Sequence, residues 1–450
     1  MRTTTPEKMA FQVYDRLWGL AMPLIRRHRR LAEGIDQRRW HSRPPGPAEL
    51  WIQAASVGEA FLALEILKRL RPGAPVGILL TTNTAQGLEI LTKARSDRLL
   101  QDRGLHVETA YFPFDRPRIM RRAVSYIRPA LMVLLEAELW PAHLAALKNA
   151  GTCILVVNGR LSAASLKRYR WWPALWRRLS PDAILAMSAA DARRFAALFG
   201  PHRVDLVPNL KFDRLDLDAP ADDDANPLAS LFFADVELLV LGSVRAAEEE
   251  AVQQIITAIR RLRPETVIAL FPRHVQRLRA WAEYLDRGRI AWRLRSHTAG
   301  PVAPGTVLLW DTFGELVAAY RLCRAAFVGG SLAPLGGQNF LEAVTSGVVP
   351  VIGPHWSNFA WVGEALFKMG LVQVAADGKR AADLLAAGLS QTPNREEIRR
   401  RAFHYIRERQ GGTERTCRLI ESILAAPRGV GASAPGCPHQ FNFPSWTLPP

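Results

Sequence analysis

Short β-rich runs alternate with helix-period segments along most of the 450-residue chain. The expected strands begin with an apolar entry at Trp51 and continue at 76–81, 130–135, 154–157, 183–187, 205–207, 237–241, 266–271, 307–310, 325–328, 349–352 and 371–374. Segments with apolar residues at helical spacing follow these runs, as in βαβ units around a parallel sheet. The alternation therefore predicts a doubly wound α/β protein.

An acidic, proline-framed stretch, RLDLDAPADDDAN, interrupts this alternation after residue 213 and is typical of a linker. We therefore expect two doubly wound, Rossmann-like domains of similar size facing across a cleft, the preferred kind of place for a small-molecule site. The expected boundaries are 1–32 for an N-terminal helix, 33–212 for the first domain, 213–234 for the linker, 235–425 for the second domain and 426–450 for a mobile tail.

Positive charge is concentrated in the first half of the chain. The net charge is +17, and residues 1–210 contain 32 lysines and arginines against 17 aspartates and glutamates. Such a field attracts an acidic partner, which leaves an anionic lipid surface, a phosphorylated substrate and nucleic acid as candidates. Nucleic acid ranks last because no RNP or zinc-finger signature accompanies the charge. The four cysteines form no CxxC pair, so we expect no metal site.

Residues 9–25 are apolar and aromatic but are interrupted by Asp15 and Arg16, and they are shorter than the roughly 20 apolar residues that span a bilayer. Four arginines follow at 26, 27, 29 and 30. This pattern predicts a helix lying in the membrane interface, with its arginines at anionic headgroups. A soluble helix packed on its own domain is the alternative.

The first half contains one polar turn that interrupts an otherwise apolar strand and helix. In WIQAASVGEAFLALEILKR, Glu59 follows the strand directly and opens the helix. In open α/β sheets, ligands bind outside the carboxyl ends of the strands, so Glu59 is a candidate catalytic residue. The same residue is also explained as a helix-start acid favoured by the helix dipole.

Other polar residues follow neighbouring strands of the first domain. Glu138 lies in LEAELWP, after the strand at 130–135, and we expect it near Glu59. Capping of the next helix is the alternative explanation for that acid. Arg160 in NGRLS and Lys211 in NLKFD are candidate contacts for an acceptor or its phosphates.

The second half contains a glycine-rich stretch, FVGGSLAPLGGQNFLE, between a strand and a helix. It matches neither GxGxxG nor the Walker pattern. Its glycines and the free N–H groups of the next helix start predict an anion or sugar-nucleotide site rather than a plain turn. The candidate donor-binding residues here are Gly330, Ser331, Gly337, Asn339 and Glu342.

Three further loops should converge on the same site. They supply Ser243 and Arg245, then Pro272, Arg273 and His274, and then Gly314. Arg245 and Arg273 could neutralise a phosphate leaving group without a metal. Each loop alone is a weak signal, and a lone histidine such as His274 is more often structural.

The ordered motifs SVGE, TTNTAQG, YFPFD, ELWP, NGRLS, NLKFD, PRH, DTFGEL, FVGGSLAPLGGQNFLEA and GPHWSNF, from Trp51 to Asn358, resemble the 3-deoxy-D-manno-octulosonic acid (Kdo) transferases of lipopolysaccharide assembly. The resemblance implies a GT-B glycosyltransferase that transfers Kdo from CMP-Kdo to a lipid A precursor (lipid IVA) with inversion. It implies no cofactor, CMP-Kdo being a co-substrate, and attachment to the cytoplasmic face of the inner membrane.

By this resemblance Glu59 matches the general base and Glu138 the acid of ELWP. Arg273, His274, Asn339 and Glu342 match donor-side positions. The chain departs from the family in having Gln53 where a histidine is frequent, SVRAAEE in place of a loop like STHEGEE, and Gln338 in place of the histidine of GGHN. The rival hypotheses are another GT-B sugar-nucleotide transferase or epimerase, and a non-enzymatic lipid- or nucleic-acid-binding module.

Overall fold

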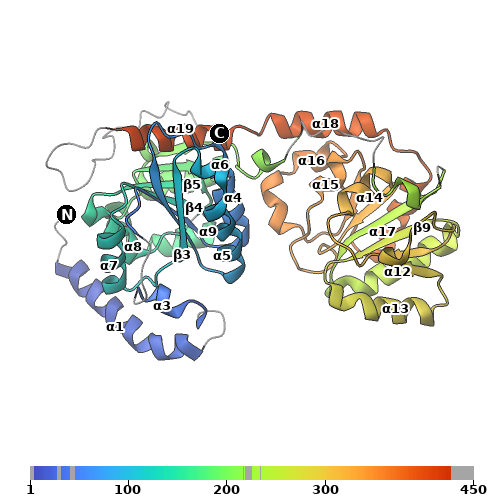
Figure 1. Cartoon of the computed structure of the whole chain (residues 1–450), viewed down its shortest axis with the longest axis horizontal. Helices are drawn as coiled ribbons and strands as arrows, with labels where there is room; N and C mark the ends of the chain where they lie inside the picture. The colour runs from blue at the N-terminus through green and yellow to red at the C-terminus, as the bar shows by residue number, and fades with distance from the viewer. Residues whose placement is uncertain are drawn as a thin grey trace. The chain divides into compact units, whose positions relative to one another are not determined.

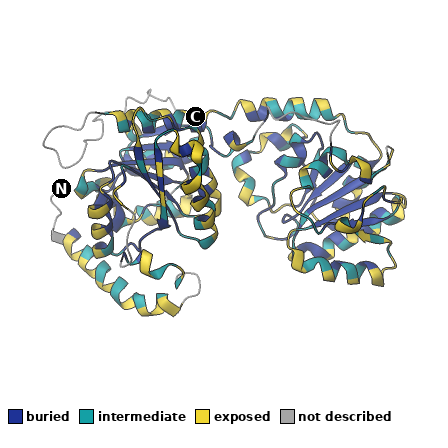
Figure 2. Ribbon diagram, viewed as in Figure 1, coloured by how far each residue is buried: buried dark blue, intermediate teal, exposed yellow. Residues whose placement is uncertain are grey.

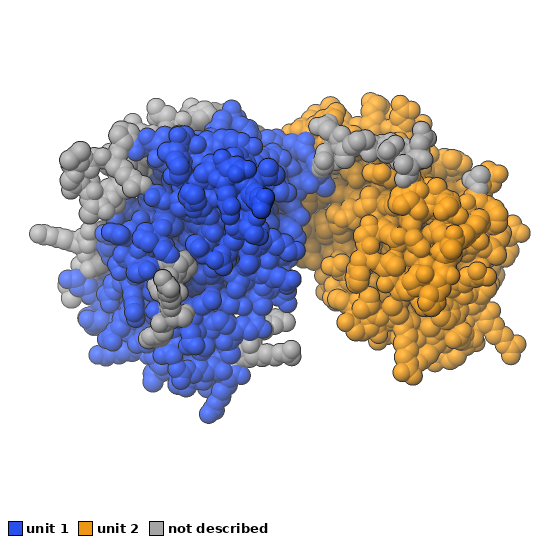
Figure 3. All heavy atoms as spheres, viewed as in Figure 1, with its two compact units in different colours: residues 1–215, 409–450 blue, residues 216–408 orange. Residues whose placement is uncertain are grey.

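The computed structural model describes residues 5–27, 32–40, 46–136, 138–215, 217, 226–233 and 235–426. Residues 216, 218–225 and 234 of the expected linker, and the expected tail from residue 427 onward, lie outside these described residues. The chain divides into two compact units, which are coloured separately in Figure 3. Unit 1 comprises Met1–Leu215 and Arg409–Pro450, and unit 2 comprises Asp216–Glu408.

Unit 1 is built on a seven-stranded parallel sheet in the order β3-β2-β1-β4-β5-β6-β7. Its strands are β1 (Leu50–Ala54), β2 (Val76–Thr82), β3 (Leu105–Tyr111), β4 (Leu131–Leu135), β5 (Cys153–Gly159), β6 (Ala183–Ala186) and β7 (Val204–Leu206). Its helices are α1 (Thr5–Arg27), α3 (Ile35–Arg38), α4 (Val57–Arg69), α5 (Ala85–Thr92), α6 (Arg98–Gln101), α7 (Pro117–Ile127), α8 (Pro141–Ala150), α9 (Ala163–Tyr169), α10 (Pro173–Arg178), α11 (Ala189–Phe199) and α19 (Gly412–Ala425). The unit is shown in Figure 1.

Helices cover both faces of the unit 1 sheet because successive strand residues point to opposite sides. In β1, Leu50 and Ile52 join one apolar core with α4 and α5, whereas Trp51 joins the other core with α7 and α8. Figure 2 shows the strands as buried between these layers. This sandwich places the carboxyl ends of β1, β4 and β5 along one edge.

Unit 2 repeats this architecture with the strand order β10-β11-β9-β8-β12-β13-β14, all parallel. Its strands are β8 (Leu238–Val244), β9 (Val267–Pro272), β10 (Trp292–Leu294), β11 (Val307–Leu309), β12 (Ala325–Val328), β13 (Pro350–Ile352) and β14 (Gln373–Val374). Its helices are α12 (Glu249–Leu262), α13 (Leu278–Arg287), α14 (Leu316–Leu322), α15 (Leu341–Thr345), α16 (Ala365–Lys368), α17 (Gly378–Leu389) and α18 (Arg395–Arg407). Two doubly wound α/β units were predicted, and both are present.

The C-terminal helix α19 belongs to unit 1, although the sequence placed residues up to 425 in the second domain. Its apolar side chains Cys417, Ile420 and Ile423 enter the same core as α4. Asp213 fixes the start of the helix by accepting hydrogen bonds from the N–H groups of Gly411 and Thr413, both 2.6 Å long. The expected boundary at residue 425 therefore differs from the structure, in which the chain returns to unit 1 at Arg409.

Helix α1 lies against unit 1 through polar contacts as well as apolar ones. Tyr14 donates a hydrogen bond to Asp115 at 3.0 Å, and Asp15 accepts from Arg116. Glu7 forms an ion pair with Arg178 near the start of the helix. These contacts fix which side of α1 faces the protein.

Candidate active site

Glu59 lies in the first turn of α4 with its side chain only 8% exposed. Ser56 caps the helix, because its hydroxyl accepts from the Glu59 N–H at 3.3 Å. The Glu59 carboxylate in turn accepts from the Ala55 N–H and from the Ser56 hydroxyl, both at 2.8 Å. The SVGE turn therefore holds the carboxylate in one orientation at the end of β1.

The pKa of Glu59 is raised from 4.5 to about 7. Burial is the largest cause, and the negative charge of Glu136 adds to it, as does that of Glu138 to a smaller extent. The hydrogen bonds from Ser56 and Ala55 act in the opposite direction. A carboxylate with a pKa near neutrality suits a general base, because it can both accept and release a proton at working pH.

Glu136 and Glu138 follow β4, which pairs directly with β1. Glu136 has a positive φ of 57° and forms an ion pair with Lys211 at 2.8 Å. Glu138 accepts from the Trp140 indole N–H at 2.7 Å and from the Asn83 amide at 3.4 Å. Adjacent strands thus bring Glu59 and Glu138 to one edge, as the sequence predicted.

A chain of hydrogen bonds connects Gln53 to Glu138. The Thr81 hydroxyl donates to the Gln53 side-chain oxygen at 2.6 Å, and the Gln53 amide donates to Asn83 at 3.4 Å. Asn83 then donates to Glu138. Gln53 is fully buried, and its amide helps to position Asn83.

The two predicted acceptor contacts differ in their surroundings. Lys211 is half-buried, and its charge is already paired with Glu136. Arg160 is exposed directly after β5, and within the described part of the chain its guanidinium forms no ion pair. Arg160 is therefore the more available cation of the two.

In unit 2, the predicted donor loops follow adjacent strands. Ser243 and Arg245 lie at the end of β8, Arg273 and His274 follow β9, and the glycine-rich loop follows β12. The Arg273 N–H donates to the Val244 carbonyl at 2.8 Å, which joins the first two loops. Ser243 has a positive φ of 55°, a strained conformation for a residue with a side chain.

Glu248 binds the backbone of the glycine-rich loop. This carboxylate is buried and accepts from the N–H groups of Gly330, Ser331 and Leu332, the last two at 3.1 and 3.2 Å. It also accepts from the Arg245 N–H at 2.9 Å. The backbone N–H groups of Gly330 and Ser331 therefore already have an acceptor within the fold, and the donor-binding role of these two residues remains a prediction.

The Ser331 hydroxyl also forms hydrogen bonds within unit 2. This buried hydroxyl donates to the Val328 carbonyl at 2.7 Å and accepts from the Gly353 N–H at 2.8 Å. A Cβ on Gly353 would lie 2.1 Å from the Ser331 carbonyl oxygen, so only glycine allows this approach. Helix α15, the helix that follows the glycine-rich stretch, has five residues, and the predicted anion site at its start remains a prediction.

Asn339 and Glu342 lie together beside Arg273. The Asn339 amide donates to Glu342 at 2.8 Å, and Gly337, two residues earlier, has a φ of 82°. Burial raises the pKa of Glu342, against the Asn339 hydrogen bond and the charge of Arg273. Arg273 and His274 are exposed, and Pro272 ends β9.

The fourth loop, which follows β11, presents an aromatic tip. Phe313 is 81% exposed beside Gly314, which has a φ of 85°. Behind this tip, Glu315 accepts from Trp310 at 2.9 Å and pairs with Arg295 at 2.8 Å. These two contacts hold the Glu315 side chain at the base of the loop.

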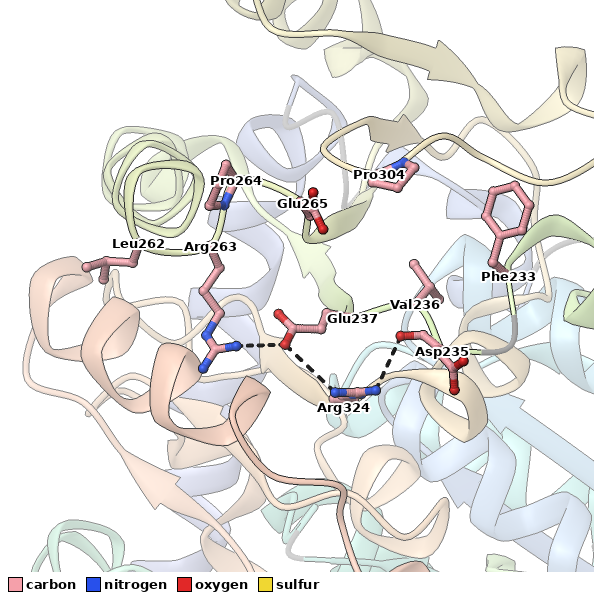
Figure 4. A pocket seen from close by; sticks show the side chains of 10 residues that line it. All are labelled: Phe233, Asp235, Val236, Glu237, Leu262, Arg263, Pro264, Glu265, Pro304 and Arg324. Atoms are coloured by element: carbon pink, nitrogen blue, oxygen red, sulfur yellow. Dashed lines mark hydrogen bonds and ion pairs between the residues drawn. The ribbon is translucent and has the colours of Figure 1, made fainter.

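A separate hollow of about 670 Å³ lies at the opposite, amino-terminal edge of the unit 2 sheet. Its two arginines are satisfied, as Figure 4 shows: Glu237 pairs with Arg263 at 2.6 Å and with Arg324 at 3.8 Å. Arg324 also donates to the Asp235 carbonyl at 3.3 Å. Among the described residues, no group of three His, Cys, Asp or Glu side chains is arranged to hold a metal ion.

Sequence reasoning missed Glu248 and gave Glu136 no role. Glu248 belongs to an acidic run, Glu248 to Glu250, that looks like an ordinary helix start. The backbone donors that it serves lie more than 80 residues away in the sequence. The ELWP motif pointed to Glu138, whereas Glu136 has the larger effect on the pKa of Glu59.

The family model described as 3-Deoxy-D-manno-octulosonic-acid transferase (kdotransferase) matches residues 27–214. The 3-deoxy-D-manno-octulosonic acid transferase of Bordetella pertussis is 32% identical over 402 residues, which cover 85% of this chain and 90% of that protein. The transferase of the same name from Haemophilus influenzae is 28% identical over 412 residues, 90% of this chain and 94% of that protein.

A solved UDP-GlcNAc 2-epimerase from Neisseria meningitidis has a TM-score of 0.52 at 12% identity, over 83% of this chain and 99% of that one. This likeness concerns the fold alone and, with the two parallel seven-stranded sheets, identifies it as GT-B, as predicted. The similarity to the Bordetella and Haemophilus proteins extends over both units. The chain belongs to the 3-deoxy-D-manno-octulosonic acid transferase family of glycosyltransferases.

Proposed function

We propose that the protein transfers Kdo from CMP-Kdo to a sugar hydroxyl of a phosphorylated lipid A precursor, lipid IVA, with inversion, without a metal and with Glu59 as general base. The observation that carries this proposal is the buried Glu59 carboxylate, whose pKa is raised to about 7 at the end of β1. Family membership supports the transfer of Kdo.

In the proposed step, the acceptor hydroxyl gives its proton to the Glu59 carboxylate while its oxygen attacks the anomeric carbon of Kdo. The bond between that carbon and the phosphate oxygen breaks, and CMP leaves with the electron pair. General-base assistance of this kind contributes about 10² to 10⁴ in rate. A single displacement from the opposite face inverts the anomeric centre.

On the donor side, we assign Arg245, Arg273 and His274 to the departing phosphate. Arg273 and His274 are exposed after β9, and Arg245 lies half-buried at the end of β8. Cations at this position neutralise the charge that develops as CMP leaves. The N–H groups of Gly330 and Ser331, in the glycine-rich loop, already donate to Glu248. We therefore propose that side chains, rather than the backbone of that loop, contact the phosphate.

Donor selectivity tests the transfer itself. We expect the purified protein to release CMP from CMP-Kdo when a bisphosphorylated lipid A precursor is present, and to form a Kdo-bearing lipid product. UDP-sugars offered with the same acceptor should give no product. Turnover of a UDP-sugar, or its epimerisation without an acceptor, would instead support the alternative of another GT-B transferase or an epimerase.

We further propose that the protein binds the cytoplasmic face of the inner membrane through α1. Met9, Val13, Leu17, Leu20 and Leu24 are between 53% and 75% exposed and recur at helical spacing along one side of the helix. Figure 2 shows exposed positions along α1. No helix within the described ranges is long and apolar enough to cross a bilayer. An exposed apolar stripe that ends at Arg26 and Arg27 suits an interfacial helix.

A matched pair of substitutions tests this attachment. Leu20→Ser removes a side chain that is 75% exposed on α1, and Leu99→Ser removes one that is 71% exposed on α6. Transfer of one leucine from water to an apolar phase is worth about 1.5 kcal/mol or more. We therefore expect Leu20→Ser to weaken binding to anionic vesicles about tenfold and Leu99→Ser to leave it unchanged. Equal effects of the two substitutions in a flotation assay would contradict the assignment.

A further inference from the structure

A hollow of about 610 Å³ lies between α1, α7 and α8 and is rich in positive charge. Its lining includes Lys8 and Arg16 from α1, and Arg118 and Arg121 from α7. The lining contains one carboxylate, Asp15, which is engaged by Arg116 at 3.2 Å and by Arg118 at 3.3 Å. The hollow therefore has an excess of cations.

Three of these cations have no acidic partner among the described residues. Within the described chain, Lys8, Arg16 and Arg121 are exposed and form no ion pair. The hollow of unit 2 drawn in Figure 4 is different, because Glu237 and a carbonyl engage both of its arginines. Uncompensated cations in a concave site favour an anionic ligand.

The positions of Lys8 and Arg16 on α1 indicate the source of that anionic ligand. Lys8, Gln12 and Arg16 form a row at four-residue spacing, one residue before the exposed apolar row of Met9, Val13 and Leu17. Successive residues are 100° apart around a helix, so the cationic row flanks the apolar stripe. If the stripe enters the acyl region, the flanking row lies at the level of the headgroups.

We propose that this hollow binds the phosphate of an anionic phospholipid headgroup in the leaflet that α1 enters. Lys8, Arg16 and Arg121 supply the charge, and the side-chain amides of Gln12 and Asn149, which also line the hollow, can hydrogen-bond the headgroup hydroxyls. The occupant is a lipid of the surrounding membrane rather than the acceptor. This inference rests on the proposed membrane attachment of α1.

The test compares two double variants that each remove two positive charges from unit 1. Arg16→Gln with Arg121→Gln alters the hollow, and Lys93→Gln with Arg98→Gln alters exposed residues elsewhere. Each basic side chain near an anionic surface strengthens binding by about fivefold. We therefore expect the first pair to weaken binding to phosphatidylglycerol-containing vesicles about 30-fold and the second pair to have a much smaller effect.

Two further variants distinguish loss of the headgroup site from loss of folding. Arg121→Gln alone alters an exposed residue of α7 without an ion-pair partner among the described residues, and should weaken binding about fivefold. Arg16→Lys with Arg121→Lys keeps both charges and should retain most of the binding. Circular dichroism of each variant should match that of the unaltered protein.

The outcomes separate this site from the proposed function. If the unaltered protein binds no vesicles, the membrane attachment and the headgroup site both fail. If it binds and the two double variants behave alike, only the headgroup site fails. Turnover with a deacylated, water-soluble acceptor in the absence of vesicles should be unchanged in the Arg16→Gln, Arg121→Gln variant; a loss there would assign the hollow to acceptor phosphates and overturn the proposal.

Discussion

At the scale of single residues, three carboxylates near the carboxyl ends of β1 and β4 have different environments. Glu59 is buried and has a pKa near 7, Glu136 is paired with Lys211, and Glu138 is held by Trp140 and Asn83. Separated environments give neighbouring acids separate roles. Glu59 is the acid that is arranged to exchange a proton near neutral pH.

The pH profile of the reaction tests this arrangement. The base must be ionised, so kcat/KM should rise with pH through the pKa of Glu59, about 7, and then level off. The negative charge of Glu136 raises that pKa, so Glu136→Gln should make Glu59 easier to ionise and move the rising limb to lower pH. The measurement is kcat/KM against pH for the variant and the unaltered enzyme.

Glu65→Gln is the matched control for this profile, because Glu65 lies on the same helix α4 and pairs with Arg69 at 3.0 Å. Its profile should coincide with that of the unaltered enzyme. If Glu136→Gln leaves the rising limb of the pH profile in place, or if Glu136→Gln and Glu65→Gln move it equally, the charge coupling between Glu136 and Glu59 is contradicted.

The position of Glu59, in the first turn of α4 directly after β1, was predictable from the sequence because the strand-turn-helix pattern is local. Its role as general base remains a prediction. The contacts of Glu248 were not predictable, since the N–H groups that it binds belong to a loop more than 80 residues away. Such a contact depends on the pairing of β8 with β12, which local patterns do not specify. The roles of the other donor-side residues remain predictions.

At the scale of elements, most strands occur close to the predicted ranges, whereas β3 and β10 were missed. Both are edge strands with charged residues, such as Glu108 in β3 and Arg293 in β10. Strands buried on both faces have continuous apolar runs, and the charged residues of β3 and β10 interrupt that signal. The domain to which α19 belongs was also predicted wrongly. The apolar face of a helix predicts that the helix is buried, but it does not specify in which of two cores.

The attachment of α19 through Asp213 leads to a local prediction. Asp213→Ala leaves the N–H groups of Gly411 and Thr413 without their acceptor. Thr413 is buried, and a buried unsatisfied donor costs about 1–3 kcal/mol. Amide hydrogen exchange should therefore accelerate in α19. Helix α18, which lies in unit 2, should keep its rate. Unaltered exchange in α19, or equal acceleration in both helices, would show that Asp213 does not hold this helix.

At the scale of the whole molecule, the charge asymmetry coincides with the division into units. The excess positive charge of residues 1–210 lies in unit 1, together with Glu59, the exposed stripe of α1 and the cation-rich hollow. Unit 2 contains the proposed donor residues. We therefore propose that the lipid acceptor and the membrane bind unit 1 and that CMP-Kdo binds unit 2.

The most direct test of this account is the rate of CMP release by Glu59→Gln with CMP-Kdo and a bisphosphorylated lipid A precursor. Ala55 and Ser56 donate to different oxygens of the Glu59 carboxylate, and glutamine keeps one of these two acceptors. The glutamine amide cannot take the acceptor proton. We expect the rate to fall by about 10² to 10⁴, with calorimetric CMP affinity unchanged. A Glu59→Gln enzyme that turns over at the rate of the unaltered protein would contradict the assignment of Glu59 as the base.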